Sequence, residues 1–396
     1  MRIAYCTDSV CHAGGIQRIT VAKANALADI EGNEVWIVVT DNKRPTPVLP
    51  ISEKVHLIDL DVNYYEDDWK SKLHVLKGIF IKRREHRRKL KELLDSILPN
   101  VVISTGTSEK NFLPRLKIAS HPKFIREIHF TSNYRQLAAN GWFEKLSAWV
   151  GDFLDYRIFI KGYDKIVVLT KEDKELHWKH NDKVIVIPNP LTVQHNKCST
   201  LTNKTVITAG RFTTQKNFSS LIRVWAIVHQ SHPDWRLEIW GEGSLKAELQ
   251  NQIDSSGLGN GMQLMGYTDD IISKFAEASI FVCSSLFEGF PLVFVEAMSC
   301  GLPIVSYACP CGPSDIISNG KDGFLVPIGG EEELARHIDA LVTDKSLRLR
   351  MGSMAKIKSE EYKTVVIIKE WIKYFERQND NRKKQKNLKR RQSPFY

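Results

Sequence analysis

The feature that most constrains the fold is a regular alternation of short apolar runs with helical stretches, which occurs twice along the chain. Each run has the length and β-branched content of a buried strand, and parallel strands need crossovers between them. In the first half these runs lie at residues 2–7, 34–39, 55–60, 100–104, 165–170 and 183–188. In the second half they lie at 206–209, 236–240, 263–265, 280–283 and 303–306, the last of which we expect to be the final core strand. The pattern predicts an α/β protein with two parallel sheets.

The two series are separated by a polar connector, and 396 residues exceed what one hydrophobic core usually holds. We therefore predict two Rossmann-like lobes that face each other across a cleft, with ligands bound at the carboxyl ends of the strands. The expected divisions are an N-terminal lobe over 1–190, a linker over 191–204, a C-terminal lobe over 205–360, a helix over 361–376 that packs back towards the N-terminal lobe, and a basic tail over 377–396.

Composition and the first residues predict the compartment. No stretch approaches the ~20 consecutive apolar residues of a membrane-spanning helix. The N-terminus enters a strand-like run without the regions of a secretory signal. Seven cysteines are scattered without a disulfide framework, which favours a reducing compartment. We expect a cytoplasmic protein.

The net charge of +10 is concentrated in two short segments. Residues 70–91 hold ten basic residues and one acidic residue, and residues 377–396 hold eight and one. Residues 73–91 fit a helix lying on an anionic membrane face, and they fit a solvated helix face equally well. The aromatic stretch at 142–159 can join such a membrane contact or form a buried helix. The charge pattern predicts two local basic elements and argues against a general nucleic-acid-binding surface.

One segment, FEGFPLVFVEAMSCG, carries most of the chemistry. It follows a predicted strand, with Pro291 at the expected first position of a helix and Gly301 just past its end. Phe290 occupies the cap position, so the amide groups of the first turn are left to bind an anion. Glu288 and Glu296 are placed to hold hydroxyl groups on either side of a bound diphosphate. As isolated residues, they are better explained as a loop charge and a helix-surface charge.

Glu288-x7-Glu296 resembles the E-x7-E signature of retaining glycosyltransferases of the GT-B fold, most closely glycosyltransferase family 4. Further motifs follow in the order of that family over roughly residues 1–376, and they are more specific in the second half. They are Gly14-Gly15-Ile-Gln-Arg, Ala209-Gly210-Arg211 with Lys216-Asn217, Trp240-Gly-Glu-Gly, Gly266-Tyr267 and Asn319–Pro327. The stretch CPCGPSDII resembles bacterial capsule, exopolysaccharide and O-antigen transferases.

The resemblance implies roles for individual residues. Arg211 and Lys216 would clamp the diphosphate of a nucleotide-sugar donor, as a guanidinium fork and a point charge are suited to do. Glu296 would bind the ribose hydroxyls, and Glu288 the hydroxyls of the transferred sugar. His129 would contact that sugar without shuttling a proton, although a lone histidine at a strand end is more often structural.

The resemblance also implies contacts that use the backbone. Gly14 and Gly15 would let the N-terminal lobe close on the phosphates. The backbone near Phe290, Leu292 and Val293 would lie beside the transferred sugar, and Tyr267 would lie beside the nucleotide base. Negative charge on the departing diphosphate would be stabilised by the cations and the helix amides.

The implied reaction moves a hexose or N-acetylhexosamine, with retention at the anomeric carbon, from a nucleotide diphosphate sugar to an acceptor hydroxyl. We favour a UDP-sugar as donor and a polyprenyl-diphosphate-linked or other lipid-linked saccharide as acceptor, in cell-surface polysaccharide biosynthesis. The protein would then work as a peripheral protein on the cytoplasmic membrane face. The leaving diphosphate would take the acceptor proton, so we expect no metal and no cofactor beyond the co-substrate. No Asp-x-Asp pair is positioned for a metal, and Cys309-x-Cys311 lacks the partners of a zinc site.

Other functions remain open at this point. A GDP-mannose-dependent mannosyltransferase fits the same motifs, and a nucleotide-sugar epimerase would share the fold. A nucleic-acid-binding protein could use the basic tail, although its cations lack interleaved aromatic residues. A dinucleotide-dependent oxidoreductase is disfavoured because Gly241-x-Gly243 lacks the third glycine of that fingerprint.

Overall fold

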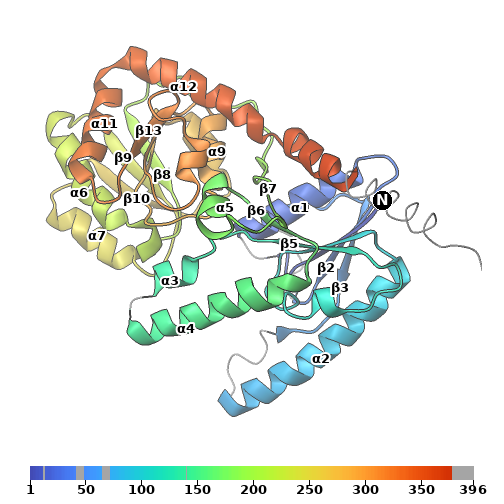
Figure 1. The fold of residues 1–396 in the computed structure, drawn as a ribbon. Helices are drawn as coiled ribbons and strands as arrows, with labels where there is room; N and C mark the ends of the chain where they lie inside the picture. Colours follow the sequence, from blue (N-terminus) through green and yellow to red (C-terminus); the bar gives the residue numbers. More distant parts are fainter. Residues whose placement is uncertain (12–13, 42–48, 65–71, 140, 377–396) are drawn as a thin grey trace, which may run out of the picture.

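The computed structural model describes residues 1–11, 14–41, 49–64, 72–139 and 141–376, with only the backbone described for 72–77. The predicted basic tail at 377–396 therefore lies outside the described residues. The chain forms two lobes, each built on a parallel sheet with helices on both faces (Figure 1). This arrangement confirms the prediction of two Rossmann-like α/β lobes.

The sheet of the first lobe has seven strands in the order β3-β2-β1-β4-β5-β6-β7, and all neighbours pair in parallel. The inner strands are buried on both faces, which is why they appear in the sequence as continuous apolar runs. The strands are β1 (Arg2–Cys6), β2 (Glu34–Val39), β3 (Val55–Asp59), β4 (Val101–Ser104), β5 (Lys123–Glu127), β6 (Lys165–Val168) and β7 (Val184–Val186).

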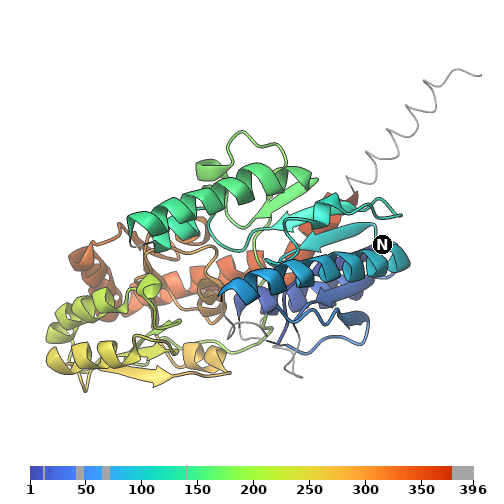
Figure 2. The same cartoon turned by 90° about the horizontal axis from the view of Figure 1, so that it is seen from below.

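In the described residues, five α-helices and three shorter helical turns that precede the second lobe surround this sheet, and residues 364–376 add a further helix described below. Helices α2 and α4 both lie on the side of the molecule that faces the viewer in Figure 2. The helices are α1 (Gly15–Ala28), α2 (Lys72–Ile97), α3 (Tyr134–Ala138), α4 (Trp142–Phe153) and α5 (Lys171–His177); the turns are η2 (Leu113–Arg115), η3 (Leu154–Ile158) and η4 (Phe159–Gly162).

The sheet of the second lobe has six parallel strands in the order β10-β9-β8-β11-β12-β13. They are β8 (Thr205–Ala209), β9 (Arg236–Trp240), β10 (Met262–Gly266), β11 (Ile280–Cys283), β12 (Ile304–Tyr307) and β13 (Gly323–Val326). The helical elements are η5 (Thr214–Lys216), α6 (Phe218–Ser231), α7 (Lys246–Ser255), α8 (Ile271–Ala276), α9 (Leu292–Ser299), α10 (Pro313–Ile316), α11 (Glu331–Thr343), α12 (Lys345–Ser359) and η6 (Glu360–Tyr362).

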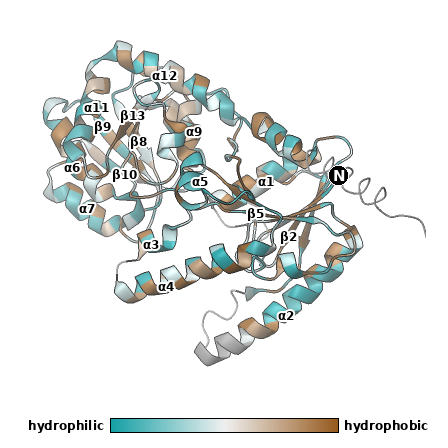
Figure 3. Cartoon of the chain, viewed as in Figure 1, coloured by the Kyte–Doolittle hydropathy of each residue, from teal (hydrophilic) through white to brown (hydrophobic). Residues whose placement is uncertain are grey.

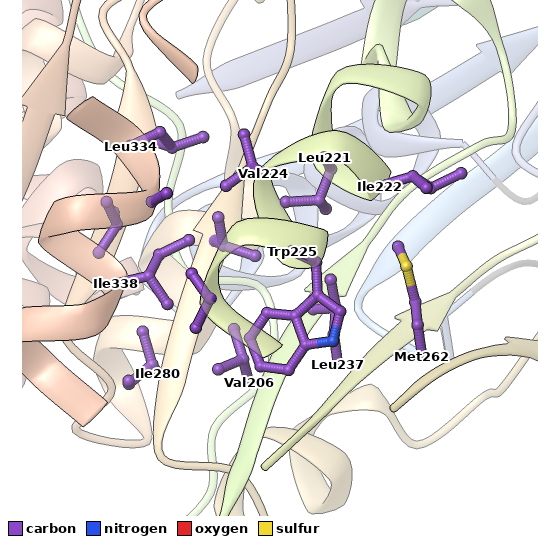
Figure 4. Packing of buried hydrophobic residues seen from close by; sticks show 14 of the residues in the cluster. Val206, Leu221, Ile222, Val224, Trp225, Leu237, Met262, Ile280, Leu334 and Ile338 are labelled. Carbon is purple, nitrogen blue, oxygen red and sulfur yellow. The ribbon is translucent and has the colours of Figure 1, made fainter. Parts of the chain in front are cut away.

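The core of the second lobe is centred on the fully buried Trp225 of α6 (Figure 4). Its ring packs among aliphatic side chains from the sheet and α11, including Val206, Leu237 and Ile338. The indole Nε1 donates a hydrogen bond to the carbonyl of Gly261 at 2.8 Å, so the polar atom of this large side chain is satisfied.

Two strands differ from the sequence-based expectation. The strand predicted to be the last core strand is β12. It is followed by β13, which pairs with β12 and forms the edge of the sheet. A Cβ on Gly323 would lie 2.3 Å from the carbonyl oxygen of Ile304, so the glycine permits this close pairing. Strand β5 was also absent from the predicted series, because Lys123 and Arg126 interrupt its apolar pattern.

The end of the described chain returns to the first lobe. Residues 364–376 are helical and lie beside α1 in Figure 1. Ile367, Ile368, Trp371 and Phe375 are buried in the core of the first lobe. The two chain crossings between the lobes are joined to each other, because Leu191 N–H donates to the carbonyl of Tyr362 at 2.7 Å. Within the described ranges, none of the helices is long and apolar enough to cross a membrane.

Candidate functional site

The first component of the candidate site is the amino end of α9, which follows β11 after a short loop. Pro291 is the N-cap, with φ −68° and ψ 90°, and the helix begins at Leu292. The prediction that Phe290 caps a helix starting at Pro291 was therefore wrong by one residue, because proline fixes φ but leaves ψ free to be extended. Phe290 is instead buried, with its ring centroid 5.6 Å from that of Tyr362. No side chain caps the helix, so the amides of Leu292 and Val293 can bind an anion.

A second helix N-terminus meets the first from the opposite lobe. Helix α1 begins at Gly15 behind Gly14, again without a side-chain cap. A Cβ on Gly15 would lie 3.6 Å from Cδ1 of Leu292, so the first turns of α1 and α9 are neighbours across the lobes. Both amino ends carry partial positive charge and unpaired N–H donors. Their convergence favours an anionic ligand between the lobes.

Lys216 and Glu288 form an ion pair beside this point. Nζ of Lys216 lies 2.6 Å from Oε1 of Glu288, and both side chains are largely buried. Burial alone would lower the pKa of Lys216, but the Glu288 carboxylate outweighs it and the pKa is raised. Gly210 makes room for the lysine, because a Cβ there would lie 2.9 Å from Cε of Lys216. The nearby Arg211 is exposed and has no ion-pair partner among the described residues, so it is available to an incoming anion.

The second carboxylate, Glu296, is buried and already paired across the lobes. Its Oε1 lies 2.8 Å from Nη2 of Arg18, which belongs to α1. The same Arg18 nitrogen donates a hydrogen bond to Oγ1 of Thr192 at 3.1 Å. The pair therefore joins the first lobe, the linker and α9 at one point.

His129 lies at the end of β5, where the first lobe faces the loop that carries Glu288. A Cβ on Gly289 would lie 2.6 Å from the carbonyl oxygen of His129, so the two backbones are in close contact. The imidazole is buried, and its Nε2 lies 3.1 Å from Oε2 of Glu127. Burial lowers the pKa of His129, and the Glu127 carboxylate offsets this only in part. The Nδ1 atom has no hydrogen-bond partner among the described residues.

Glu127 is also the partner of a buried lysine. Lys23 of α1 donates to Oε2 of Glu127, and both side chains are almost completely buried. Nζ of Lys23 also lies 5.1 Å from the ring centroid of Trp371 in the C-terminal helix. The cluster of Lys23, Glu127 and His129 thus ties α1, β5 and residues 364–376 together directly behind the site.

Tyr267 lies on the rim of the second lobe at the end of β10. Its side chain is exposed, and its hydroxyl donates a hydrogen bond to Oδ1 of Asp269 at 2.7 Å. This hydrogen bond is the main cause of the raised pKa of Tyr267, and the charge of Arg18 acts in the opposite direction. Tyr267 is therefore placed on the same side of the second lobe as the interlobe ion pair.

A cavity in the first lobe adjoins His129. It is lined by aromatic and cationic side chains from β5, α3 and the turns after α4, among them Lys110, Arg126, His129, Arg135, Tyr156 and Tyr163. The lining is partly neutralised, because Asp155 accepts from Lys110 at 2.6 Å and also pairs with Arg135. The cavity has room for a polar ligand on the first-lobe side of the site.

The sequence-predicted residues fall into three groups. The structure gathers Gly15, Lys216, Glu288, Glu296 and the first turn of α9 where the lobes meet. His129 is brought to the same place by its backbone, while its side chain turns into the protein. Arg211 and Tyr267 lie in the second lobe with exposed side chains.

Sequence reasoning missed Arg18, Lys23 and Glu127. Arg18 stands at the end of the Gly-Gly motif, so its place one turn into α1 was an available signal. Lys23 was signalled by a single cation inside a run of small apolar residues. Among the described residues, no group of three or more His, Cys, Asp or Glu could hold a metal ion. Cys309 and Cys311 are buried, and burial raises the pKa of both thiols.

Comparisons with known proteins identify the second lobe directly. Residues 194–358 match the family model described as glycosyl transferases group 1. An uncharacterised glycosyltransferase of Haemophilus influenzae is 28% identical over 374 residues, covering 93% of this chain and 98% of the relative. A Campylobacter jejuni N-acetylgalactosaminyltransferase, named for a diphospho-undecaprenol-linked acceptor, is 28% identical over 174 residues, covering 44% of this chain and 47% of its own length.

Solved structures extend the likeness to the whole fold. S. aureus TarM, crystallised with α-GlcNAc-glycerol and UDP among its ligands, aligns with a TM-score of 0.73 at 16% identity. The alignment covers 94% of this chain and 99% of TarM. At that identity the likeness concerns the fold alone. Residues 194–358 thus belong to the glycosyl transferases group 1 family, and the chain as a whole has the GT-B fold.

Proposed function

We propose that this protein is a retaining glycosyltransferase of family 4 that moves a hexose or N-acetylhexosamine from a nucleotide diphosphate sugar to a lipid-linked saccharide. The observation that carries the proposal is the convergence of two uncapped helix N-termini between two buried carboxylates. Helix amides and cations suit a diphosphate, and carboxylates suit the hydroxyls of the sugars on either side of it.

The donor diphosphate would lie against the amides of Leu292 and Val293, with Arg211 and Lys216 as its cationic partners. These groups would stabilise the negative charge that develops as the sugar departs. Lys216 is held for this role by Glu288, whose charge keeps the ammonium protonated in a buried setting. Because the cations and amides neutralise the diphosphate, the proposed reaction needs no metal.

The two carboxylates would bind hydroxyl groups. Glu296 would bind the ribose of the donor, which requires Arg18 to share or release the carboxylate oxygen that it now holds. Glu288 would bind the transferred sugar, with the His129 backbone across the interface. The leaving diphosphate would take the proton of the acceptor hydroxyl on the same face of the sugar, so that the anomeric configuration is retained.

The acceptor would enter from the first lobe through the cavity beside His129. A lipid-linked saccharide is favoured because the first lobe also carries the basic helix α2. The side chains of Arg84, Arg87 and Arg88 on this helix are exposed, and they are suited to bind an anionic membrane face. The Campylobacter relative, named for an undecaprenol-linked acceptor, supports the same class. We therefore place the reaction in cell-surface polysaccharide biosynthesis, at the cytoplasmic side of the membrane.

The test is a donor panel with purified full-length protein and detergent-solubilised bacterial lipid extract, scored by released nucleoside diphosphate. We expect release of UDP that depends on lipid and is unaffected by EDTA. Lys216→Ala and Glu288→Ala should each lower the rate by about a hundredfold or more. Lys204→Ala is the matched control, because Lys204 pairs with Asp234 on the exposed surface of the same lobe.

The panel also separates the alternatives. Lipid-dependent release of GDP from GDP-mannose would replace the UDP-sugar with that donor. Conversion of one nucleotide sugar into another without release of diphosphate would show an epimerase and refute the transfer. Inversion of the anomeric centre, read from the proton NMR coupling of the product, would refute the retaining mechanism alone. A protein that releases no nucleotide from any donor, and that binds nucleic acid only while residues 377–396 are present, would favour the nucleic-acid-binding alternative.

A further inference from the structure

Helix α4 presents its apolar side to solvent. Only Ala148 and Asp152 are buried along this helix, and the exposed positions include Trp142, with 66% of its surface accessible. The exposed large apolar side chains of α4 and the turn after it are Trp142, Phe143, Leu146, Trp149, Val150, Phe153, Leu154 and Ile158. The alternative that this aromatic stretch forms a buried helix is therefore wrong.

Polar contacts join α4 to α3. Asp152 accepts hydrogen bonds from Nη1 of Arg135 at 3.1 Å and from Nε2 of Gln136 at 2.9 Å. Arg135 also pairs with Asp155, just beyond the end of the helix. A surface helix normally turns its apolar stripe to the core and its charges to water. In α4 the large apolar side chains face solvent together with Glu144 and Lys145, and this exposed apolar surface indicates a second apolar environment outside the protein.

The chemistry around α4 points to a lipid bilayer as that environment. Tryptophan is enriched at membrane–water interfaces, and tryptophan, phenylalanine and leucine are typical of the apolar face of helices that lie in the interface. Helix α2 lies on the same side of the molecule (Figure 2), and it carries exposed Phe80 and Ile81 next to exposed arginines. The apolar segments of α4 and the mainly hydrophilic course of α2 can be compared in Figure 3. Apolar side chains flanked by cations complement an anionic membrane surface.

The position of α4 relative to the acceptor cavity agrees with a bilayer. The chain continues from α4 into the turns η3 and η4, and Asp155, Tyr156 and Ile160 of these turns line the cavity beside His129. A lipid whose chain lies along the outside of α4 could therefore present its polar head to the cavity.

We propose that the outer face of α4 embeds in the acyl boundary of an anionic bilayer, while the arginines of α2 bind the headgroups. The proposal rests on the proposed function in one respect: access to a lipid-linked acceptor is the reason why the protein would contact a membrane. The contact itself can be measured without any sugar transfer.

The experiment measures co-sedimentation of the full chain with vesicles of phosphatidylcholine containing about a third phosphatidylglycerol. We expect Trp142→Glu with Trp149→Glu to lower binding by at least about tenfold. The control is Leu176→Glu with Ile357→Glu, which adds the same charge at equally exposed apolar positions outside α4. It should bind as the unaltered protein does. Circular dichroism and the unfolding midpoint verify that both double variants are folded.

A second readout measures insertion directly. Brominated phosphatidylcholine should quench tryptophan fluorescence in the unaltered protein, and Trp142→Phe with Trp149→Phe should remove that quenching while retaining binding. Equal binding of the two glutamate variants, or quenching that survives in the phenylalanine variant, would overturn the proposal. A third result would also overturn it: the unaltered protein does not bind vesicles but forms dimers, and Trp142→Glu with Trp149→Glu abolishes these dimers. Helix α4 would then be an interface between copies of the chain.

Failure of this proposal is distinguishable from failure of the proposed function. If both are right, the α4 glutamate variant keeps nucleotide release with detergent-solubilised lipid but loses it with vesicles. Vesicle binding without release from any donor would refute the transferase and leave α4 as a membrane face. Equal release from vesicles by all variants would refute the role of α4 and leave the transferase in place.

Discussion

Replacing Glu127 by glutamine is the sharpest test of how the first lobe supports the site. The substitution keeps the shape of the side chain but leaves the ammonium of Lys23 buried without its counter-charge. Removing one member of a buried ion pair typically costs about 3–5 kcal/mol, because the remaining charge is uncompensated. We therefore expect the free energy of unfolding to fall by about that amount at pH 7.

The pKa of Glu127 gives a second estimate of the same quantity. Burial would raise this pKa, but Lys23 and His129 outweigh it and lower the value from 4.5 to about 2. At about 1.4 kcal/mol per pH unit, this lowering corresponds to about 3 kcal/mol of stability. Because the folded-state pKa is depressed, the contribution is present above pH 4.5 and is lost as the pH falls towards 2. The deficit of the variant should therefore shrink in acid.

The assay is urea unfolding followed by circular dichroism, at neutral pH and at a pH between 4.5 and 2, where the contribution of Glu127 is lost. Lys23→Met and the double variant Lys23→Met with Glu127→Gln complete a thermodynamic cycle. Each single change should be severe, and the double variant should lose much less than the sum. A single Glu127→Gln that unfolds like the unaltered protein, or strict additivity in the cycle, would refute a coupled pair behind the site.

Further predictions concern other described positions. His86 is buried, which lowers its pKa to about 4, so the folded state excludes a proton that the unfolded chain binds. The free energy of unfolding should therefore fall as the pH drops from 6.5 towards 4. In urea titrations, His86→Gln should remove that part of the acid dependence. Gly289→Ala places a Cβ 2.6 Å from a backbone oxygen of the first lobe; kcat/KM should fall about tenfold or more, whereas Gly259→Ala, which meets nothing within 4 Å, should leave it unchanged. Arg18→Ala should lower kcat/KM for the donor by about tenfold or more because it removes a cation from the interlobe site; Arg2→Ala, which breaks an exposed pair, should have no effect.

Much of the fold could be predicted because local pattern and tertiary environment agree. β2 (Glu34–Val39) and β11 (Ile280–Cys283) were located to the residue, since both are continuous apolar runs bounded by polar positions. Strand β5 (Lys123–Glu127) escaped prediction because its burial is decided by neighbouring strands and not by its own composition.

The residues of the site also divide into those that a local sequence pattern marks and those that it does not. Each second-lobe residue lies within a short motif that marks it in the sequence, although the contact of Lys216 with Glu288 joins positions 72 residues apart. The pairing of Arg18 with Glu296 joins positions 278 residues apart, and no local pattern encodes it. The outward face of α4 is a similar case, because periodicity gives an apolar stripe but does not say which environment the stripe meets.

The return of residues 364–376 into the first lobe has a consequence for synthesis. Ile367, Ile368, Trp371 and Phe375 complete a core whose other buried members precede residue 188. During translation, the apolar surface of the lobe that is made first is covered only after residues 364–376 have been made, whereas the second lobe can close its own core beforehand. A ribosome stalled beyond the second lobe would thus hold one finished lobe and one unfinished lobe. The unfinished lobe would be the natural place for chaperones to bind.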